Sequence, residues 1–303
     1  MELRQLKYFA KAAELLSFSE AARSLNIAQS TLSQQVRQLE NELDVQLFDR
    51  QAHTISLTEA GANMLPYALR TLCEAESCRA RVADLTALAT GELRIGVTYS
   101  FSPILTETLV EFTHRYPGIK LEVYYKPMSE LMRMLQGRAL DFVLAFRPTE
   151  RIDDIESHVL FDNHLSVIVR EGHPLASVGS VTVERLSSCS IALPCNGLQA
   201  RNALEHCLEV SGKRIPEARI ELNEVNILLE LVRKSDMITI LAEATVYNQS
   251  GVKALPLEDL HCEMEGCIHA LRNSYRKHSA LAFIDMLRDS PAVTARRHNW
   301  FKL

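Results

Sequence analysis

The chain has 303 residues, enough for two or three ordinary domains, and its 47% hydrophobic and 23% charged residues lie in the range of globular proteins. No stretch approaches the roughly 18 consecutive apolar residues of a membrane-spanning helix, and the charged start lacks a signal-peptide core, so we expect a cytoplasmic protein with no membrane partner. The net charge of −5 excludes DNA binding that rests on bulk positive charge, because residues 1–60 also hold more acidic than basic side chains.

The first sixty residues predict three short helices. Apolar residues recur at helical spacing over residues 3–16 and predict the first helix. Ser17 and Glu20 have the spacing of a capping box, which predicts that a second helix begins at Ser17. Asn26 tolerates a left-handed turn, and residues 29–43 then predict a third helix. Its inward-facing apolar positions are expected to be Leu32, Val36, Leu39 and Leu43.

Two short helices joined by a tight turn, the second polar at its exposed N-terminal end, are typical of a helix-turn-helix. Gln can pair with adenine through two hydrogen bonds, and Ser and Thr hydroxyls can bind bases or phosphates. The free N–H groups at a helix N-terminus also attract phosphate. We therefore predict binding to double-stranded DNA, with a three-helix domain for protein contacts as the alternative. The candidate DNA-binding residues are Ser17, Gln29, Ser30, Thr31, Ser33, Gln34, Arg37, Arg50 and His53.

A hairpin and a long helix follow the predicted helix-turn-helix. Residues 50–57 predict two short extended pieces that form a wing, in which Arg50 and His53 would lie against phosphate or the minor groove. Apolar spacing then predicts a helix from Thr58 to about Leu88. Its roughly thirty residues would be about 45 Å long. That is too long for a small domain to cover alone, so we expect a partner helix beside it.

Six segments of this region, taken together in their order and spacing, resemble the N-terminus of LysR-type transcriptional regulators. They are Leu6–Phe9, Ser17–Ala22, Ala28–Ser33, Gln38–Leu43, Gln46–Arg50 and Leu57–Gly61. The resemblance covers nearly the whole chain. It implies a winged helix-turn-helix domain over 1–58, a linker helix for dimerisation and a hinge over 59–90, and an effector-binding regulatory domain over 91–303.

The resemblance also implies the partners of the protein. Family members form homodimers and homotetramers, which place two recognition helices on a pseudo-palindromic operator. They respond to a small-molecule effector, here expected to be a metabolite, and RNA polymerase is a further partner if the protein is an activator. We therefore expect a regulator of promoters that either activates or represses, and not an enzyme.

Four positions depart from the family pattern. Ser30 stands where the family usually has proline, Gln34 and His53 where arginine is common, and Asp44 where glycine is usual. Asp is tolerated in left-handed geometry, so Asp44 does little harm. The loss of two cations predicts weaker nonspecific attraction to DNA and a shallower salt dependence than in typical relatives.

Strands and helices alternate from residue 91 onward, which implies a parallel α/β sheet. The predicted strands are 92–97, 120–125, 141–146, 164–170, 190–193, 218–222, 237–241 and 266–272, and the predicted helices are 104–116, 129–136, 198–211, 225–234 and 279–289. This pattern resembles the family's two-lobed α/β effector domain, which is similar in fold to periplasmic solute-binding proteins. The first lobe would hold about 91–162 and 267–303, and the second about 163–266.

Ligands of open α/β sheets bind at the carboxyl ends of strands, near helix N-termini. The candidate effector-binding residues at such positions are Ser100, Phe101, Lys126, Ser129, Phe146, Arg147, Cys195, Asn196 and Leu241. Many relatives open the second helix of this domain with Gly followed by Ser or Thr, whose hydroxyl and amide meet a carboxylate effector. Lys126 and Pro127 stand there in this chain, and proline has no N–H. We therefore expect Ser129 to cap the helix, and Lys126 either to attract an anion or to be a solvated surface side chain.

The seven cysteines show neither zinc-site spacing nor the density of a secreted disulfide framework, so we expect reduced thiols, no metal and no cofactor. Cys207 matches the second sensing position of redox-sensing relatives. The first position falls near Leu198 or Gln199 rather than at Cys195, and redox sensing stays an alternative. For an enzyme, the sequence lacks a P-loop, GxSxG, HExxH or GxGxxG motif. A transport-type solute binder would not need the N-terminal domain.

Overall fold

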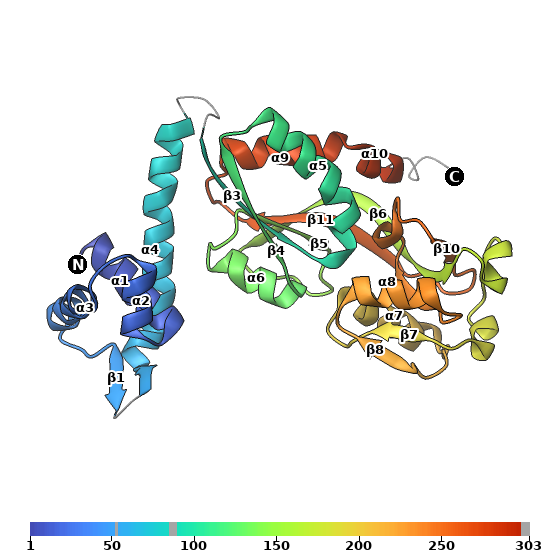
Figure 1. The fold of residues 1–303 in the computed structure, drawn as a ribbon, viewed down its shortest axis with the longest axis horizontal. Helices are drawn as coiled ribbons and strands as arrows, with labels where there is room; N and C mark the ends of the chain where they lie inside the picture. Colours follow the sequence, from blue (N-terminus) through green and yellow to red (C-terminus); the bar gives the residue numbers. More distant parts are fainter. Residues whose placement is uncertain (52–53, 85–89, 298–303) are drawn as a thin grey trace. The chain divides into compact units, whose positions relative to one another are not determined.

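The computed structural model describes residues 1–51, 54–84 and 90–297, and the chain divides into two compact units, Met1–Ala87 and Leu88–Leu303 (Figure 1). The first unit is mostly helical, and the second is a mixed α/β structure. Over the described ranges, no helix is both long enough and apolar enough to cross a membrane.

The first unit contains three short helices, a hairpin and a long helix. These are α1 (Leu3–Leu15), α2 (Phe18–Ser24), α3 (Gln29–Leu43), β1 (Phe48–Gln51), β2 (Thr54–Leu57) and α4 (Glu59–Asp84). The two strands pair antiparallel. The three predicted helices and the two-stranded wing are thus confirmed. The tip of the wing at 52–53 and the predicted end of the long helix at 85–88 lie outside the described residues.

Local signals set the boundaries of these helices. The Ser17 side chain caps α2 by accepting a hydrogen bond from the Glu20 N–H at 3.3 Å. Asn26 and Asp44 both adopt a left-handed φ of 54°, the first in the turn before α3 and the second at its end. The prediction that Leu43 faces inward was wrong: it is 38% exposed, because it lies in the last turn of α3, past the buried positions that end at Glu40.

An aromatic cluster anchors the hairpin to the helices. The ring of Phe48 in β1 meets Phe9 and Phe18 edge-on, with centroid distances of 5.6 and 5.1 Å. The start of α4 packs directly against the backbone at Leu47. A Cβ on Gly61 would lie 2.1 Å from the Leu47 carbonyl oxygen. Only glycine fits there, so the hairpin and α4 are held at a fixed separation.

The second unit has two lobes. The first lobe consists of β3 (Gly91–Val97), β4 (Ile119–Tyr125), β5 (Phe142–Phe146), β11 (Glu263–Leu271), α5 (Ser102–Arg115), α6 (Met128–Gln136) and α9 (His278–Asp289). The second lobe consists of β7 (Ala192–Pro194), β8 (Ile220–Leu222), β9 (Thr239–Ala242), β10 (Val252–Pro256), α7 (Gln199–Ser211) and α8 (Val225–Lys234). The long β6 (Ile155–Arg170) belongs to both lobes, because it pairs with β11 in the first and with β9 and β10 in the second.

The main sheet is mixed, which corrects the predicted parallel sheet. Its strand order is β10-β6-β11-β5-β3-β4, and β9 pairs with β6 beside this path. Among the described strands of this sheet, β3 pairs parallel with β4 and with β5. In contrast, β11 runs antiparallel to both β5 and β6. The strand β11, which comes from the C-terminal part of the chain, lies between β5 and β6 and runs antiparallel to both, so the sheet is not purely parallel.

Three further details differ from the predictions. The structure extends β6 back to Ile155, whereas the predicted strand begins at 164, and it adds β10 and the helix α10 (Pro291–Arg297), which the pattern had not indicated. The prediction that Ser129 caps α6 was wrong, because Pro127 is the N-cap residue and no side chain caps this helix. The proline ring already fixes the extended backbone needed at that position.

Candidate functional site

The exposed face of α3 brings most of the predicted DNA-binding residues together. Those on its surface are Gln29, Ser30, Thr31, Gln34 and Arg37, and Ser33 between them is half-buried. The opposite face is fixed in the core by Leu32, Val36 and Leu39, which have no exposed surface. Helical spacing therefore holds amide, hydroxyl and guanidinium groups on one rigid face.

The N-terminus of α3 is open. The N-cap residue is Ala28, whose side chain cannot form a capping hydrogen bond, and the first turn of α3 contains no acidic residue. The free N–H groups and the positive end of the helix dipole therefore face outward beside Gln29 and Ser30, where a phosphate oxygen could accept their hydrogen bonds.

Ser17 and Arg50, two further predicted DNA-binding residues, lie on other elements than α3. Ser17 is half-buried, and its hydroxyl oxygen is used to cap α2. Arg50 lies in β1 opposite Ile55. His53 lies outside the described residues.

Glu40 is a structural residue of this unit that the sequence reasoning missed. Its side chain is only 2% exposed, and Oε1 accepts hydrogen bonds from the N–H groups of Leu47 at 2.9 Å and Phe48 at 3.3 Å. A buried carboxylate at the end of the recognition helix thus fixes the start of the wing. Its helical position near Leu39 and Leu43 gave no sign of a partner beyond the helix.

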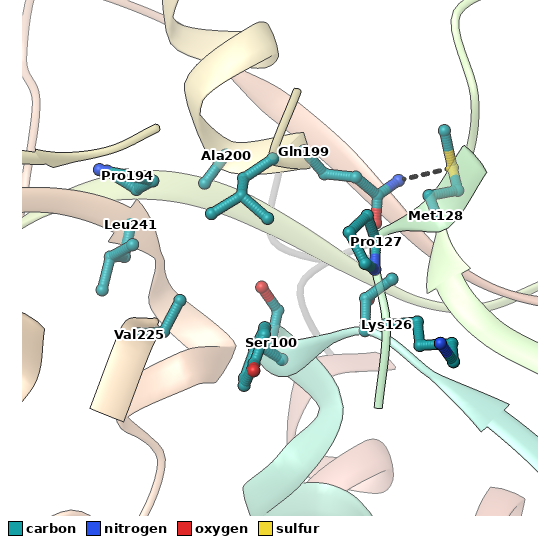
Figure 2. A pocket seen from close by; sticks show the side chains of 12 residues that line it. Ser100, Lys126, Pro127, Met128, Pro194, Gln199, Ala200, Val225 and Leu241 are labelled. Carbon is teal, nitrogen blue, oxygen red and sulfur yellow. Dashed lines mark hydrogen bonds between the residues drawn. The ribbon is translucent and has the colours of Figure 1, made fainter. Parts of the chain in front are cut away.

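The second unit contains a cleft where the two lobes meet, with an empty volume of about 410 Å³ (Figure 2). Mostly apolar side chains line it, and they come from strand ends and helix N-termini of both lobes. The lining residues are Thr98, Tyr99, Ser100, Lys126, Pro127, Met128, Pro194, Leu198, Gln199, Ala200, Val225 and Leu241.

Two sets of hydrogen bonds cross from one lobe to the other at this cleft. The hydroxyl of Tyr99, in the first lobe, donates to Glu224 Oε2 of the second lobe at 2.7 Å. The side-chain amide of Gln199 on α7 forms two hydrogen bonds with the backbone of Phe146. Its Oε1 accepts from the Phe146 N–H at 3.1 Å, and its Nε2 donates to the Phe146 carbonyl oxygen at 2.9 Å. Gln199 Nε2 also contacts Met128 Sδ at 2.9 Å, as the dashed line in Figure 2 shows.

Family models match both units of the chain. Residues 3–62 match the bacterial regulatory helix-turn-helix protein of the lysR family, and residues 86–292 match the LysR substrate binding domain. The chain belongs to the LysR family of transcriptional regulators. This LysR-family chain is therefore a DNA-binding transcriptional regulator with an effector-binding domain, and it is not an enzyme, as the sequence predicted.

Relatives and solved structures agree with this assignment. The RuBisCO operon transcriptional regulator of Allochromatium vinosum is 30% identical over 215 residues, which are 71% of each chain. A full-length OxyR variant from Pseudomonas aeruginosa has the same fold, with a TM-score of 0.75, 24% identity and 96% of each chain covered. Full-length CbnR, solved with its target DNA, has a TM-score of 0.65 at 20% identity, covering 95% of this chain and 99% of that one.

The cleft of this LysR-family regulator contains some of the predicted effector-binding residues and leaves others outside. Ser100, Lys126 and Leu241 line it. Phe101 and Phe146 lie in the hydrophobic core instead, with at most 1% of their surface exposed. Phe101 follows β3 and Phe146 is the last residue of β5, and both rings lie in the core.

The other four candidates are not among the residues that line the cleft. Ser129 is exposed in the first turn of α6, and Asn196 is exposed in the connection between β7 and α7. Cys195 is half-buried in that same connection. Arg147 is exposed and forms an ion pair with Glu265, so its guanidinium already has a carboxylate partner. The lining residues missed by the sequence reasoning include Tyr99 and Gln199, whose partners lie far away in the chain.

No group of His, Cys, Asp and Glu side chains in the described part of the chain could hold a metal ion. None of the seven cysteines forms a disulfide. Cys207 Sγ lies 3.7 Å from the His261 carbonyl oxygen, and burial raises the pKa of the Cys262 thiol. A raised pKa disfavours the thiolate, the reactive form.

Proposed function

We propose that α3 enters the major groove of double-stranded DNA and that two copies of the chain read a pseudo-palindromic operator. The exposed amides of Gln29 and Gln34, the hydroxyls of Ser30 and Thr31, and the open N-terminus of α3 support this role. Gln can specify adenine, and the helix end and Arg37 can position phosphates. The DNA-bound structure of CbnR supports the proposal by its similar fold.

Pairing of two copies follows from the exposed surface of α4. Its apolar side chains Tyr67, Leu69 and Val82 are 71%, 39% and 67% exposed. A second copy of α4 would cover Tyr67 and Val82, which lie on about the same face of the helix, and a helix-turn-helix short of cations needs two half-sites for strong binding. A homodimer is therefore the proposed DNA-binding unit, and a homotetramer would form through the second unit, as the family resemblance implies.

A small-molecule metabolite bound in the cleft is the proposed effector. The observation that carries this role is the hydrogen-bonded contact between the lobes at the cleft, Tyr99 with Glu224 and Gln199 with Phe146. A ligand among these groups changes which lobe separation has the lowest free energy. That change alters how copies assemble on a promoter, and contact with RNA polymerase follows if the protein activates.

The DNA-binding part of the proposal can be tested by footprinting the full chain on the region upstream of its own gene. We expect two protected half-sites with centres about 10 base pairs or a multiple apart. The variant Gln29→Ala with Gln34→Ala should lose protection, whereas Ser211→Ala, at the exposed end of α7 in the second unit, should retain it. No protection by the wild type, or equal protection by all three proteins, would contradict the proposal.

The effector part can be tested by screening small metabolites for a shift in the melting temperature of the full chain. Ala200 lines the cleft and is 6% exposed, so Ala200→Trp would place a large side chain in it. We expect this variant to bind DNA and to lose the ligand-induced shift. Ser211→Trp at the exposed end of α7 should keep the shift. A shift that survives in Ala200→Trp would place the ligand elsewhere.

A further inference from the structure

The hydrogen-bonding groups of the cleft restrict the chemistry of its ligand, provided that the cleft is the effector site proposed above. Three of the lining side chains already donate their protons within the protein. Tyr99 donates to Glu224 at 2.7 Å, Thr98 donates to the Leu144 carbonyl oxygen at 3.4 Å, and the Gln199 amide donates to Phe146 and Met128.

The oxygen of Tyr99 therefore acts only as an acceptor toward the cleft. Its hydrogen bond to Glu224 raises the pKa of Tyr99 to about 12, so the phenol stays protonated. A ligand atom beside this oxygen must donate a hydrogen to it. If the Tyr99 proton turned toward a ligand anion instead, Glu224 would lose a hydrogen bond and two negative charges would come close together, which costs free energy.

Lys126, which lines the cleft, and Glu224, the partner of Tyr99, are both compensated. Lys126 forms an ion pair with Glu130, one turn into α6, and Figure 2 shows its ammonium directed away from Leu241 and Val225. Glu224 accepts hydrogen bonds from the backbone and side chain of Asn226, both at 2.9 Å, besides that of Tyr99. Neither an anion nor a cation thus finds an unpaired opposite charge.

Two kinds of group remain for a ligand oxygen. The Ser100 hydroxyl has no hydrogen-bond partner in the part of the chain that the structure describes, and it can donate or accept. The backbone N–H groups in the first turns of α6 and α7 border the cleft and can donate. Pro127, at the start of α6, has no N–H to add to them.

From these groups we infer that the effector is an uncharged, largely apolar small molecule whose polar group both donates and accepts hydrogen bonds, as a hydroxyl or a primary amide does. Met128, Val225 and Leu241 contact its apolar body. Its donor meets the Tyr99 oxygen, and its oxygen meets Ser100 or a helix N–H. A carboxylate only accepts, so it leaves the Tyr99 oxygen without a partner.

Matched fragments test this inference on the full-length protein. Each set places a primary amide, a carboxylate and an ammonium on the same ring, beginning with benzamide, benzoate and benzylammonium, and affinities are measured by ligand-observed NMR. We expect the amides to bind about tenfold or more tighter than the matched acids and amines. Binding should disappear in Ala200→Trp, whose folding is checked by its melting transition.

The variant Tyr99→Phe removes the acceptor and should abolish the preference for amides. Tyr125→Phe is the matched control, because its ring centroid lies 5.9 Å from that of Tyr99 and its hydroxyl contacts Ser102 outside the cleft lining. Acids that bind in the cleft as tightly as amides, or a preference that survives in Tyr99→Phe, would overturn this inference and leave the effector site intact. Failure of every fragment set to bind in the cleft would overturn the effector site as well.

Discussion

The Tyr99 hydroxyl and the Glu224 carboxylate, 125 residues apart in the chain, form a 2.7 Å hydrogen bond that joins the two lobes of the second unit. This bond, with burial as a second cause, raises the pKa of Tyr99 to about 12. The phenol therefore keeps its proton at neutral pH. Glu224 also caps α8, so this contact connects the cleft to the position of a second-lobe helix.

Removal of this bond should weaken the contact between the lobes. We expect Tyr99→Phe to lower the free energy of unfolding of the second unit by about 1 kcal/mol, the usual net value of a partly exposed hydrogen bond. Urea denaturation measures the change. The double variant Tyr99→Phe with Glu224→Gln should cost no more than the costlier single variant. Strict additivity of the two single changes would contradict a direct bond between these side chains.

Loss of the Glu40 carboxylate should destabilise the DNA-binding unit. Glu40→Ala leaves the buried N–H groups of Leu47 and Phe48 without this acceptor, which we expect to cost about 2 to 3 kcal/mol of unfolding free energy. Glu40→Gln keeps an acceptor oxygen and should lose less. Urea denaturation of the full chain, followed by circular dichroism, measures both changes. Equal stability of Glu40→Ala and wild type would argue against this role.

The salt dependence of DNA binding should change with the side chain at position 34. Gln34 is exposed on α3, where an arginine would reach phosphate. We expect Gln34→Arg to steepen the plot of log affinity against log salt concentration by about 0.9, the value for one added phosphate contact. Ser211→Arg, at the exposed end of α7 in the second unit, controls for added charge outside the DNA-binding unit. An unchanged slope in Gln34→Arg would mean that this position does not face the DNA backbone.

His269 should make the second unit sensitive to acid. Its Nε2 lies 3.2 Å from the Ala145 carbonyl oxygen, to which it donates, and its Nδ1 lies 2.8 Å from the Ser157 hydroxyl, which donates to it when the ring is neutral. Burial, the largest cause, lowers its pKa from 6.5 to about 4. Below pH 6.5 this histidine binds a proton in the unfolded chain but not in the native protein. The free energy of unfolding therefore falls as the pH drops from about 6.5 to about 4.

The expected loss from this residue is about 3 kcal/mol at pH 4 and nothing at pH 7. Denaturant titrations across this pH range measure it. His269→Gln keeps a donor and an acceptor without the proton uptake, so its stability should fall less steeply with pH than that of wild type. His114→Gln, at an exposed site on α5, should follow wild type. A steep fall in His269→Gln equal to that of wild type would assign the acid sensitivity to other groups.

Local signals made most of the DNA-binding unit predictable from the sequence. Ser17 caps α2, Asn26 and Asp44 take left-handed conformations, and the apolar spacing of α3 fixes which face is buried. Each of these depends on residues within one or two turns of one another. Glu40 escaped prediction because its partners lie seven and eight residues away, across a turn whose path the sequence does not show.

The effector cleft was harder to predict for the same reason. Strand ends correctly indicated Ser100, Lys126 and Leu241 as neighbours of a cleft, but Phe101 and Phe146 enter the core. Which side chain after a strand faces the cleft depends on the turn and on packing between distant segments. The first half of β6 was missed because charged residues such as Glu156 and Asp162 interrupt its apolar pattern, although main-chain pairing with β11 holds it as a strand.

The central claim is that α3 reads DNA sequence, and the ratio of specific to nonspecific affinity tests it most directly. Fluorescence anisotropy can compare the full chain on its footprinted operator and on a scrambled duplex of equal length, for wild type and Gln34→Ala. We predict that Gln34→Ala lowers operator affinity by about tenfold or more, the value of one bidentate base contact, and leaves affinity for the scrambled duplex unchanged. An equal change on both duplexes, or no change on either, would contradict the claim.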